Sequence, residues 1–306
     1  MIAIFSALAP VFLMIALGYI LKNRALISDG FWAPAEKMTF YAFFPALLLI
    51  NTAKADFGDI AVTPIIWASA SGVLIISGLT LWMRPRLGID GPAFTSVFQG
   101  TIRPNVYLGI AAAVALYDSA GLTLISVCIA VLVPLVNILS VIVLVRHAAH
   151  NEEIPGWSQT LGPVARNPLI LACGVGIILN VTGIGGPPLI SPFLEILGRA
   201  ALPIGLLAVG AGLDFDAMAR AGKTVGLTTA TKVIALPAVT FVTCHLFGVS
   251  GLSLTITVLY ASLPVSATSY VLARQMGGDT ALLAATITAT TVAAMITMPL
   301  AVLLLS

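Results

Sequence analysis

The amino-acid sequence predicts an all-α membrane protein whose ten transmembrane helices form two inverted repeats of five helices each. Three observations predict this class: an apolar composition, ten apolar segments of membrane-spanning length, and a weak repeat between the two halves. Of the 306 residues, 59% are hydrophobic and only 8% are charged, whereas soluble domains have about 25% charged residues. Because so little polar surface cannot hold a folded chain in water, we expect the protein to reside in the lipid bilayer.

Charge and cysteine content exclude several other classes of protein. The net charge is +2 and the sequence has no run of lysine or arginine, so we expect no nucleic-acid partner. The three cysteines lie far apart in apolar segments without CxxC spacing, which is typical of buried thiols rather than of disulfides or zinc ligands. No metal site and no cofactor are therefore expected.

Ten segments reach the length of about 20 mostly apolar residues that a transmembrane helix needs. In the first segment the basic residues Lys22 and Arg24 follow the apolar run, so it is predicted to be a membrane helix and not a cleaved signal peptide. The predicted spans are residues 2–21, 35–53, 60–83, 91–117, 120–145, 165–183, 192–212, 224–247, 252–273 and 281–305.

The positive charges predict how the chain is oriented. Cytoplasmic loops of membrane proteins carry an excess of lysine and arginine. With the amino terminus outside, the outer connections hold only Lys54. We therefore predict both termini on the outer side of the inner (plasma) membrane. The cytoplasmic loops and their flanks then hold nine basic residues: Lys22, Arg24, Arg84, Arg86, Arg146, Arg166, Arg220, Lys223 and Arg274.

A polar segment at residues 146–162 is predicted to be a cytoplasmic linker between the two repeats, residues 1–145 and 163–306. Each half has an odd number of spans, so the halves enter the membrane from opposite sides, and any similarity between them implies an inverted repeat. The segment PVFLMIALGYIL at Pro10 matches PLILACGVGIIL at Pro168, an offset of 158. The segments FPALLL and LPIGLL match at the same offset.

The fourth and ninth predicted spans each contain a proline near the middle, Pro104 and Pro264. Proline lacks a backbone N–H and clashes with the preceding helical turn, so both helices are predicted to break there. The freed backbone groups cannot face lipid. After each break a new half-helix presents free N–H groups and a partial positive charge. The alternative is that the prolines only kink the helices for packing.

Arg103 lies about 12 residues into the fourth span, roughly 18 Å along a helix and thus near the mid-plane of the membrane. A charged arginine there costs on the order of 3 kcal/mol, so a bound anion is a natural partner. Two half-helix N-termini, a guanidinium and neutral donors suit a carboxylate. In the alternative interpretation, Arg103 reaches the membrane surface or pairs with Glu195, Asp214 or Asp118.

The candidate substrate site therefore consists of residues at the two breaks. Its predicted members are Arg103, Pro104, Asn105, Tyr107, Pro264, Ser266, Thr268 and Ser269. Lys232, a second cation within a predicted span, is either a coupling or anion-holding group or a side chain that reaches the inner surface. Candidate cavity residues at membrane depth are Tyr41, Asn51 and Gln99.

The sequence favours a carrier for a small organic anion over the other functions of membrane proteins. It has no HExxH motif and no pair of aspartates within the spans, so we expect no intramembrane enzyme and no catalytic residues. A non-transport sensor would normally carry a soluble signalling domain, and we expect none.

Four segments resemble the auxin efflux carrier family, and the resemblance extends over the whole chain. The most specific pieces are RPN-x-Y and LP…YVLA. The four segments are APVFLMIALGYILKNRALIS, YAFFPALLLINT, FQGTIRPNVYLGI and LPVSATSYVLARQMGGD. The resemblance implies a fold like that of the bile acid sodium symporters, in which the fourth and ninth helices cross. It also implies a scaffold of spans 1, 2, 6 and 7, a transport domain of spans 3–5 and 8–10, elevator-type motion and a homodimer.

The same resemblance implies a substrate bound at the crossing, either a small carboxylate such as malate or malonate or an auxin-like acid. Family members bind it there with asparagines. Asn105 matches this pattern, whereas the second break has Val265 and Ser266 instead. Arg103 is therefore expected to hold a smaller, more highly charged anion than auxin. Coupling to H+, coupling to Na+ as in a symporter of the bile acid type, and uncoupled transport all stay open.

Overall fold

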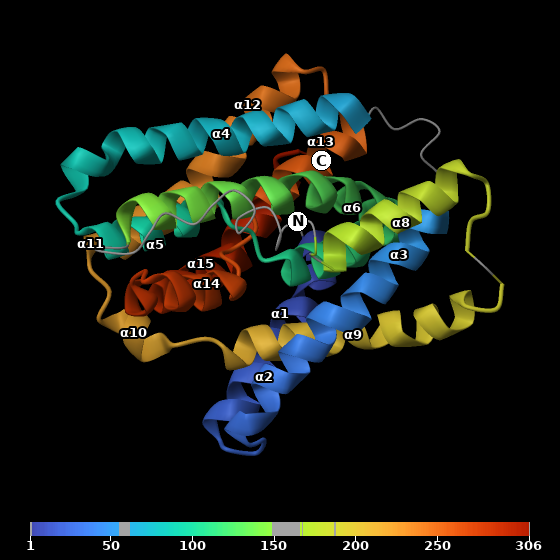
Figure 1. Ribbon diagram of the computed structural model, residues 1–306, viewed down its shortest axis with the longest axis horizontal. Coiled ribbons are helices and arrows are strands. Elements are labelled where there is room, and N and C mark those ends of the chain that lie inside the picture. Colours follow the sequence, from blue (N-terminus) through green and yellow to red (C-terminus); the bar gives the residue numbers. More distant parts are fainter. Residues whose placement is uncertain (1, 55–61, 149–165, 167, 187, 306) are drawn as a thin grey trace. The chain divides into compact units, whose positions relative to one another are not determined.

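The computed structural model describes residues 2–54, 62–148, 166, 168–186 and 188–305 (Figure 1). In this part of the chain the regular structure is helical, apart from one isolated antiparallel β-bridge between Pro104 and Val265. The predicted all-α class is confirmed. The predicted linker lies, beyond Ala148, outside the described residues.

Six of the described helical segments are long and apolar enough to cross a membrane. Two shorter apolar helices, α8 (Pro168–Val181) and α13 (Gly251–Ala261), accompany them. The six segments are Ile4–Asn23, Val62–Leu87, Val106–His147, Ser191–Ala211, Lys223–Leu246 and Thr280–Leu303.

The longest helix, α6 (Val106–His147), is in fact two helices joined by a sharp turn. Tyr117 and Asp118 have non-helical backbone angles, and the φ of Asp118 is +49°. The left-handed region is uncommon for a residue other than glycine, so a helix cannot continue through this position. The predicted boundary between the fourth and fifth spans, residues 118–119, falls at this turn.

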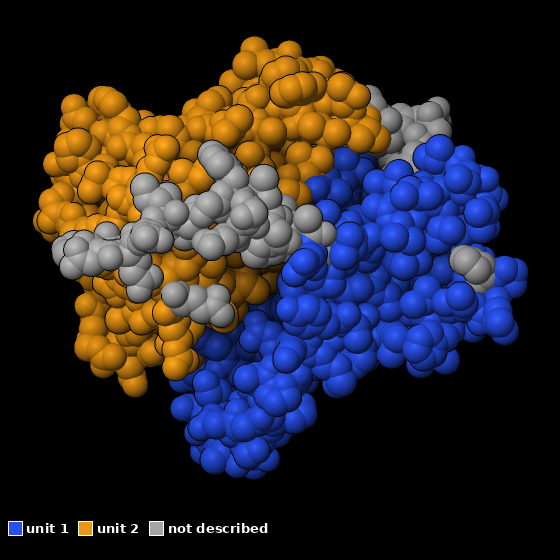
Figure 2. All heavy atoms as spheres, in the orientation of Figure 1, with its two compact units in different colours: residues 1–60, 107–130, 165–212 blue, residues 61–106, 131–164, 213–306 orange. Residues whose placement is uncertain are grey.

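The chain forms two compact units, and each draws on both halves of the sequence (Figure 2). The first unit comprises Met1–Ile60, Tyr107–Ala130 and Ala165–Gly212. The second comprises Ala61–Val106, Val131–Val164 and Leu213–Ser306.

In the first unit, α1 packs against α9, and α3 packs against both α8 and α9. Between α2 and α3 lies a π-helical turn, η1 (Thr39–Phe43). The other helices are α1 (Ile2–Asn23), α2 (Asp29–Met38), α3 (Phe44–Lys54) and α9 (Ser191–Ala211).

Glycines allow two of these helix pairs to approach at backbone distance. A Cβ atom at Gly18 of α1 would clash with the backbone of Leu207 in α9. A Cβ atom at Gly176 of α8 would lie 2.9 Å from the carbonyl oxygen of Leu49 and 2.8 Å from Cβ of Thr52, both in α3. Close packing through small residues is a usual way for helices to associate within a membrane.

Replacing Gly176 with valine should destabilise the first unit. The added side chain must push α3 and α8 apart, and overpacking of this kind costs about 1–3 kcal/mol. Gly174 is the matched control, because it lies on the same helix and a Cβ there meets nothing within 4 Å. We expect Gly176→Val to lower the melting temperature of the detergent-solubilised protein by several degrees more than Gly174→Val. Equal melting temperatures for the two variants would contradict this packing.

In the second unit, α4 packs against α12, and α15 packs against α5, α10, α11, α13 and α14. A second π-helical turn, η2 (Thr231–Ala235), lies between α11 and α12. The other helices are α4 (Val62–Leu87), α5 (Gly91–Ile102), α10 (Phe215–Ala219), α11 (Lys223–Ala230), α12 (Leu236–Leu246), α14 (Thr268–Met276) and α15 (Thr280–Leu303).

Three aspartates of the second unit cap helix N-termini, where a carboxylate can accept a free backbone N–H. Asp90 accepts from Ala93 N at the start of α5. Asp214 and Asp279 do the same for α10 and α15. These acidic side chains are therefore used at helix ends.

Candidate anion-binding site

Both proline-containing segments of the second unit leave the helical conformation where the sequence predicts. The first break separates α5, which ends at Ile102, from α6, which begins at Val106. The second separates α13, which ends at Ala261, from α14, which begins at Thr268. Each break thus removes helical hydrogen bonds from a few residues around its proline.

The two non-helical links satisfy much of their backbone hydrogen-bonding capacity by pairing with each other. The Asn105 N–H donates to the Pro264 carbonyl oxygen at 2.8 Å, and the Ser266 N–H donates to the Arg103 carbonyl oxygen at 3.3 Å. The Val265 N–H donates to Oγ1 of Thr290 in α15 at 3.1 Å. This pairing answers the requirement that backbone polar groups in an apolar interior find partners.

Arg103 is only 7% exposed and lies in this paired region. Its Nη2 donates to Oγ1 of Thr268 at 3.2 Å. Its Nε and Nη1 have no hydrogen-bond partner among the described residues. A buried guanidinium with two unpartnered nitrogens calls for a further acceptor, because unpaired buried charge is costly.

The carboxylates proposed as alternative partners of Arg103 are engaged or placed elsewhere. Glu195 pairs with Lys54 at 2.7 Å within the first unit, the one ion pair among the described residues. Asp214 caps α10 by accepting from Ala217 N. Asp118 lies at the turn within α6. Arg103 is also buried and does not reach the surface.

Hydroxyl groups cluster at the start of α14, where Thr268 accepts the hydrogen bond from Arg103. Oγ of Ser266 lies 2.9 Å from Oγ1 of Thr268 and accepts the Thr268 N–H at 3.3 Å. Ser269 is fully buried, and its hydroxyl has no partner among the described residues. The positive end of the α14 dipole therefore lies beside a cation and several donors, an arrangement that attracts an anion.

Two predicted members of the site differ in their surroundings. Asn105 is buried in the second unit, in the link between α5 and α6. Tyr107 belongs to the first unit, where its ring stacks on Phe44 with centroids 4.4 Å apart and planes 11° apart. The Tyr107 hydroxyl has no hydrogen-bond partner in the described part of the chain. Its role in substrate binding stays a prediction.

Lys232 lies on η2 and is completely buried. Its Nζ donates to the carbonyl oxygen of Ala261, the last residue of α13, at 3.4 Å. The interpretation in which this side chain reaches the inner surface is therefore wrong.

The other candidate cavity residues have separate environments. Gln99 of α5 is fully buried, and both ends of its amide lack partners among the described residues. Tyr41 and Asn51 belong to the first unit. Tyr41 is 62% exposed, and Asn51 Nδ2 donates to the Leu47 carbonyl oxygen of its own helix at 2.7 Å.

Sequence reasoning missed Thr290, whose hydroxyl accepts the backbone N–H of Val265. The available signal was the threonine-rich segment TITATT at residues 286–291, in the middle of an otherwise apolar span. Among the described residues, no group of three or more histidine, cysteine, aspartate or glutamate side chains is placed to hold a metal ion.

Comparisons with known proteins agree on the class. The sequence profile of the family described as "Membrane transport protein" matches residues 157–302. An uncharacterized transporter of Methanothermobacter thermautotrophicus is 24% identical over 301 residues, which cover 95% of this chain and 94% of the relative. These similarities support the resemblance to the auxin efflux carrier family that the four sequence segments predict, and they indicate a membrane transporter.

Proposed function

We propose that this transporter carries a small organic anion, bound through its carboxylate to Arg103 between the two helix breaks. The observation that carries the proposal is the buried Arg103 guanidinium with unpartnered Nε and Nη1, next to the N-terminus of α14. A carboxylate offers two acceptor oxygens in the plane of a guanidinium, and bidentate pairing of this kind is among the strongest hydrogen-bonded contacts in proteins. Malonate and malate are the substrates of this class that we favour.

The hydroxyls at the second break would complete recognition of the anion. Ser266, Thr268 and Ser269 all follow Pro264 closely in sequence, and hydroxyls can donate to a carboxylate or accept from a substrate hydroxyl. Asn105 would contribute from the opposite link. The site needs no metal ion, because the guanidinium and the helix N-terminus supply the positive charge.

We infer further that the transporter has ten spans in two inverted repeats whose fourth and ninth helices cross. The glycine contacts of the first unit support the repeat. Gly18 packs on Leu207, and the residues displaced from these two by the sequence offset of 158 are Gly176 and Leu49, which also pack on each other. In the first contact the glycine comes from the first half and the leucine from the second, and in the other contact the halves are exchanged. This exchange is what an inverted repeat requires.

Transport would follow from movement of the second unit, which contains Arg103, relative to the first unit. This is the elevator-type mechanism that the family resemblance implies, and with it we propose a homodimer in the inner (plasma) membrane with both termini outside. A carrier that binds its anion at a single buried site must expose that site alternately to each side.

A panel of anions tests the proposed function. A ligand at 100 times its Kd stabilises the folded state by about 2.7 kcal/mol, so a true substrate should raise the melting temperature of the purified protein by several degrees. We expect malonate or malate to do so, and acetate or indole acetate less, each compared with chloride and sulfate and with and without sodium. If no carboxylate in the panel stabilises the protein or enters proteoliposomes that contain it, the proposal fails.

A further inference from the structure

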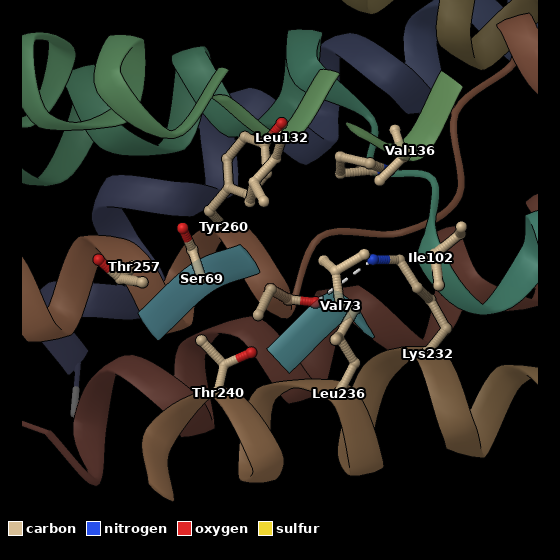
Figure 3. A pocket seen from close by; sticks show the side chains of 12 residues that line it. Ser69, Val73, Ile102, Leu132, Val136, Lys232, Leu236, Thr240, Thr257 and Tyr260 are labelled. Atoms are coloured by element: carbon tan, nitrogen blue, oxygen red, sulfur yellow. Dashed lines mark hydrogen bonds between the residues drawn. The ribbon is translucent and has the colours of Figure 1, made fainter. Parts of the chain in front are cut away.

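A second buried cation lies in the second unit, on the other side of the chain from the Arg103 site. Lys232 points into a small cavity, and the dashed line in Figure 3 marks its hydrogen bond to the end of α13. The cavity is lined from beside both helix breaks: by Ile102, the last residue of α5, and Pro104 at the first break, and by Tyr260 and Ala261, the last two residues of α13, before the second. A change in the charge of Lys232 would therefore alter the electrostatic potential at both links.

The backbone at the first break separates the two cations. Arg103 has the extended angles φ −81° and ψ 115°, and successive side chains of an extended segment point to opposite sides. Ile102 and Pro104 face the Lys232 cavity, whereas Arg103 faces Thr268. The two positive side chains thus lie on opposite sides of one short link and not in a common pocket.

The cavity can connect Lys232 to a water molecule. Its volume is about 10 Å³, which is room for about one water. The hydroxyls of Ser69 and Thr257 line it and donate to carbonyls of their own helices, at 2.6 Å and 2.7 Å. Their oxygens can still accept a hydrogen bond, so a water there can receive one from the lysine and donate one to a hydroxyl.

The surroundings of Lys232 hold no described carboxylate within 4 Å. Of the residues that line its cavity, Tyr260 is the other titratable group. The helices α5, α13 and α15 contain no charged residue. The charged or titratable groups of the other elements around it are Arg84 and Arg86 of α4, Tyr107, Tyr117, Asp118, Cys128, Arg146 and His147 of α6, Lys223 of α11, and Cys244 and His245 of α12.

From this arrangement we propose that Lys232 is the proton-coupling residue of the carrier: it takes up one proton from solution when a carboxylate binds at Arg103, and releases that proton when the anion leaves. In the empty carrier, two uncompensated positive charges would repel each other across one link in a medium of low dielectric constant. A bound carboxylate neutralises Arg103 and removes that repulsion, so the amine of Lys232 becomes an ammonium. The cargo is then one anion with one proton.

This inference rests on the proposed anion site, and the test separates the two. The heat of malonate binding to the purified wild type is measured by calorimetry in two buffers of different ionisation enthalpy; acetate replaces malonate if it stabilises the protein more. The dependence on buffer gives the number of protons taken up. Because binding takes up a proton, the wild-type affinity should fall by up to about tenfold per pH unit as pH rises through the range where Lys232 loses its proton.

Two variants and one control variant test whether the proton that is taken up binds to Lys232. Arginine stays charged at any accessible pH, so Lys232→Arg should bind the anion without proton uptake and with an affinity that does not depend on pH. Lys232→Met should likewise take up no proton, and this variant replaces Lys232→Arg in the experiment if the arginine variant does not fold. Lys223→Arg, an exposed lysine at the start of α11, should behave as the wild type.

Three results would decide against the inference. A wild type that binds malonate or acetate without taking up protons overturns it while leaving the anion site intact. A folded Lys232 variant that takes up as many protons as the wild type also overturns it. If no carboxylate of the panel binds the wild type at all, the proposed function fails and this inference fails with it.

Discussion

Arg103→Ala should abolish carboxylate binding while leaving the purified transporter folded. Truncating one partner of a buried, hydrogen-bonded charge pair costs about 2–5 kcal/mol, which is a loss of at least about 30-fold in affinity. In the anion-free protein, however, Arg103 is a buried charge with two unpartnered nitrogens. Its removal should therefore leave the melting temperature of the empty protein unchanged or raise it. The expected signature is lost ligand-dependent stabilisation without lost intrinsic stability.

Arg103→Lys refines this prediction. Lysine keeps the positive charge but offers a compact ammonium in place of a planar fork, so binding should be weaker than in the wild type and stronger than in Arg103→Ala. Thermal stability with and without malonate, together with uptake into proteoliposomes, measures both effects. A large drop in the melting temperature of the empty Arg103→Ala protein would instead indicate that Arg103 holds the fold together.

Thr290→Val should destabilise the second helix break and reduce transport. The Thr290 hydroxyl accepts the N–H of Val265, and valine of similar shape would leave that buried donor without its partner at a cost of about 1–3 kcal/mol. The affected link carries Pro264 and Ser266, whose backbone groups pair with Asn105 and Arg103 of the first link. We expect a melting temperature several degrees below that of the wild type and weaker malonate binding.

Thr291 provides the matched control for this substitution. Thr290 and Thr291 are both buried, and each donates a hydrogen bond to the Ile287 carbonyl oxygen of their own helix. Thr291→Val therefore removes only a bond within the helix, whereas Thr290→Val also removes the contact to Val265. Similar melting temperatures and affinities for the two variants would show that the contact between α15 and the second break is unimportant.

The sequence was informative where structure is dictated by local chemistry. Pro104 and Pro264 placed both helix breaks to within a few residues, because proline disrupts the hydrogen bonds of its own turn in any context. The end of the fourth span was placed equally well, at the turn that Asp118 makes in the left-handed region. Apolar length and composition sufficed for the membrane class.

What the sequence left open depends on contacts between distant segments. Whether Arg103 pairs with a carboxylate of the protein or with a bound anion depends on where Glu195 lies. Glu195 forms a hydrogen-bonded ion pair with Lys54, which is 141 residues away in the chain. Lys232 was equally compatible with the surface and with the interior, because a long side chain near a helix end can reach either. Thr290 lies among several other threonines of α15, and the sequence does not distinguish it from them. Only the packing of α15 against the second break shows that its hydroxyl accepts the N–H of Val265.

The most direct test of the anion site is a cryo-EM map of the transporter with its most strongly stabilising carboxylate. We expect density for the anion within about 3 Å of Nε or Nη1 of Arg103, at the start of α14. A map in which a carboxylate of the protein itself occupies those two nitrogens, or in which the anion binds away from Arg103, would contradict this expectation.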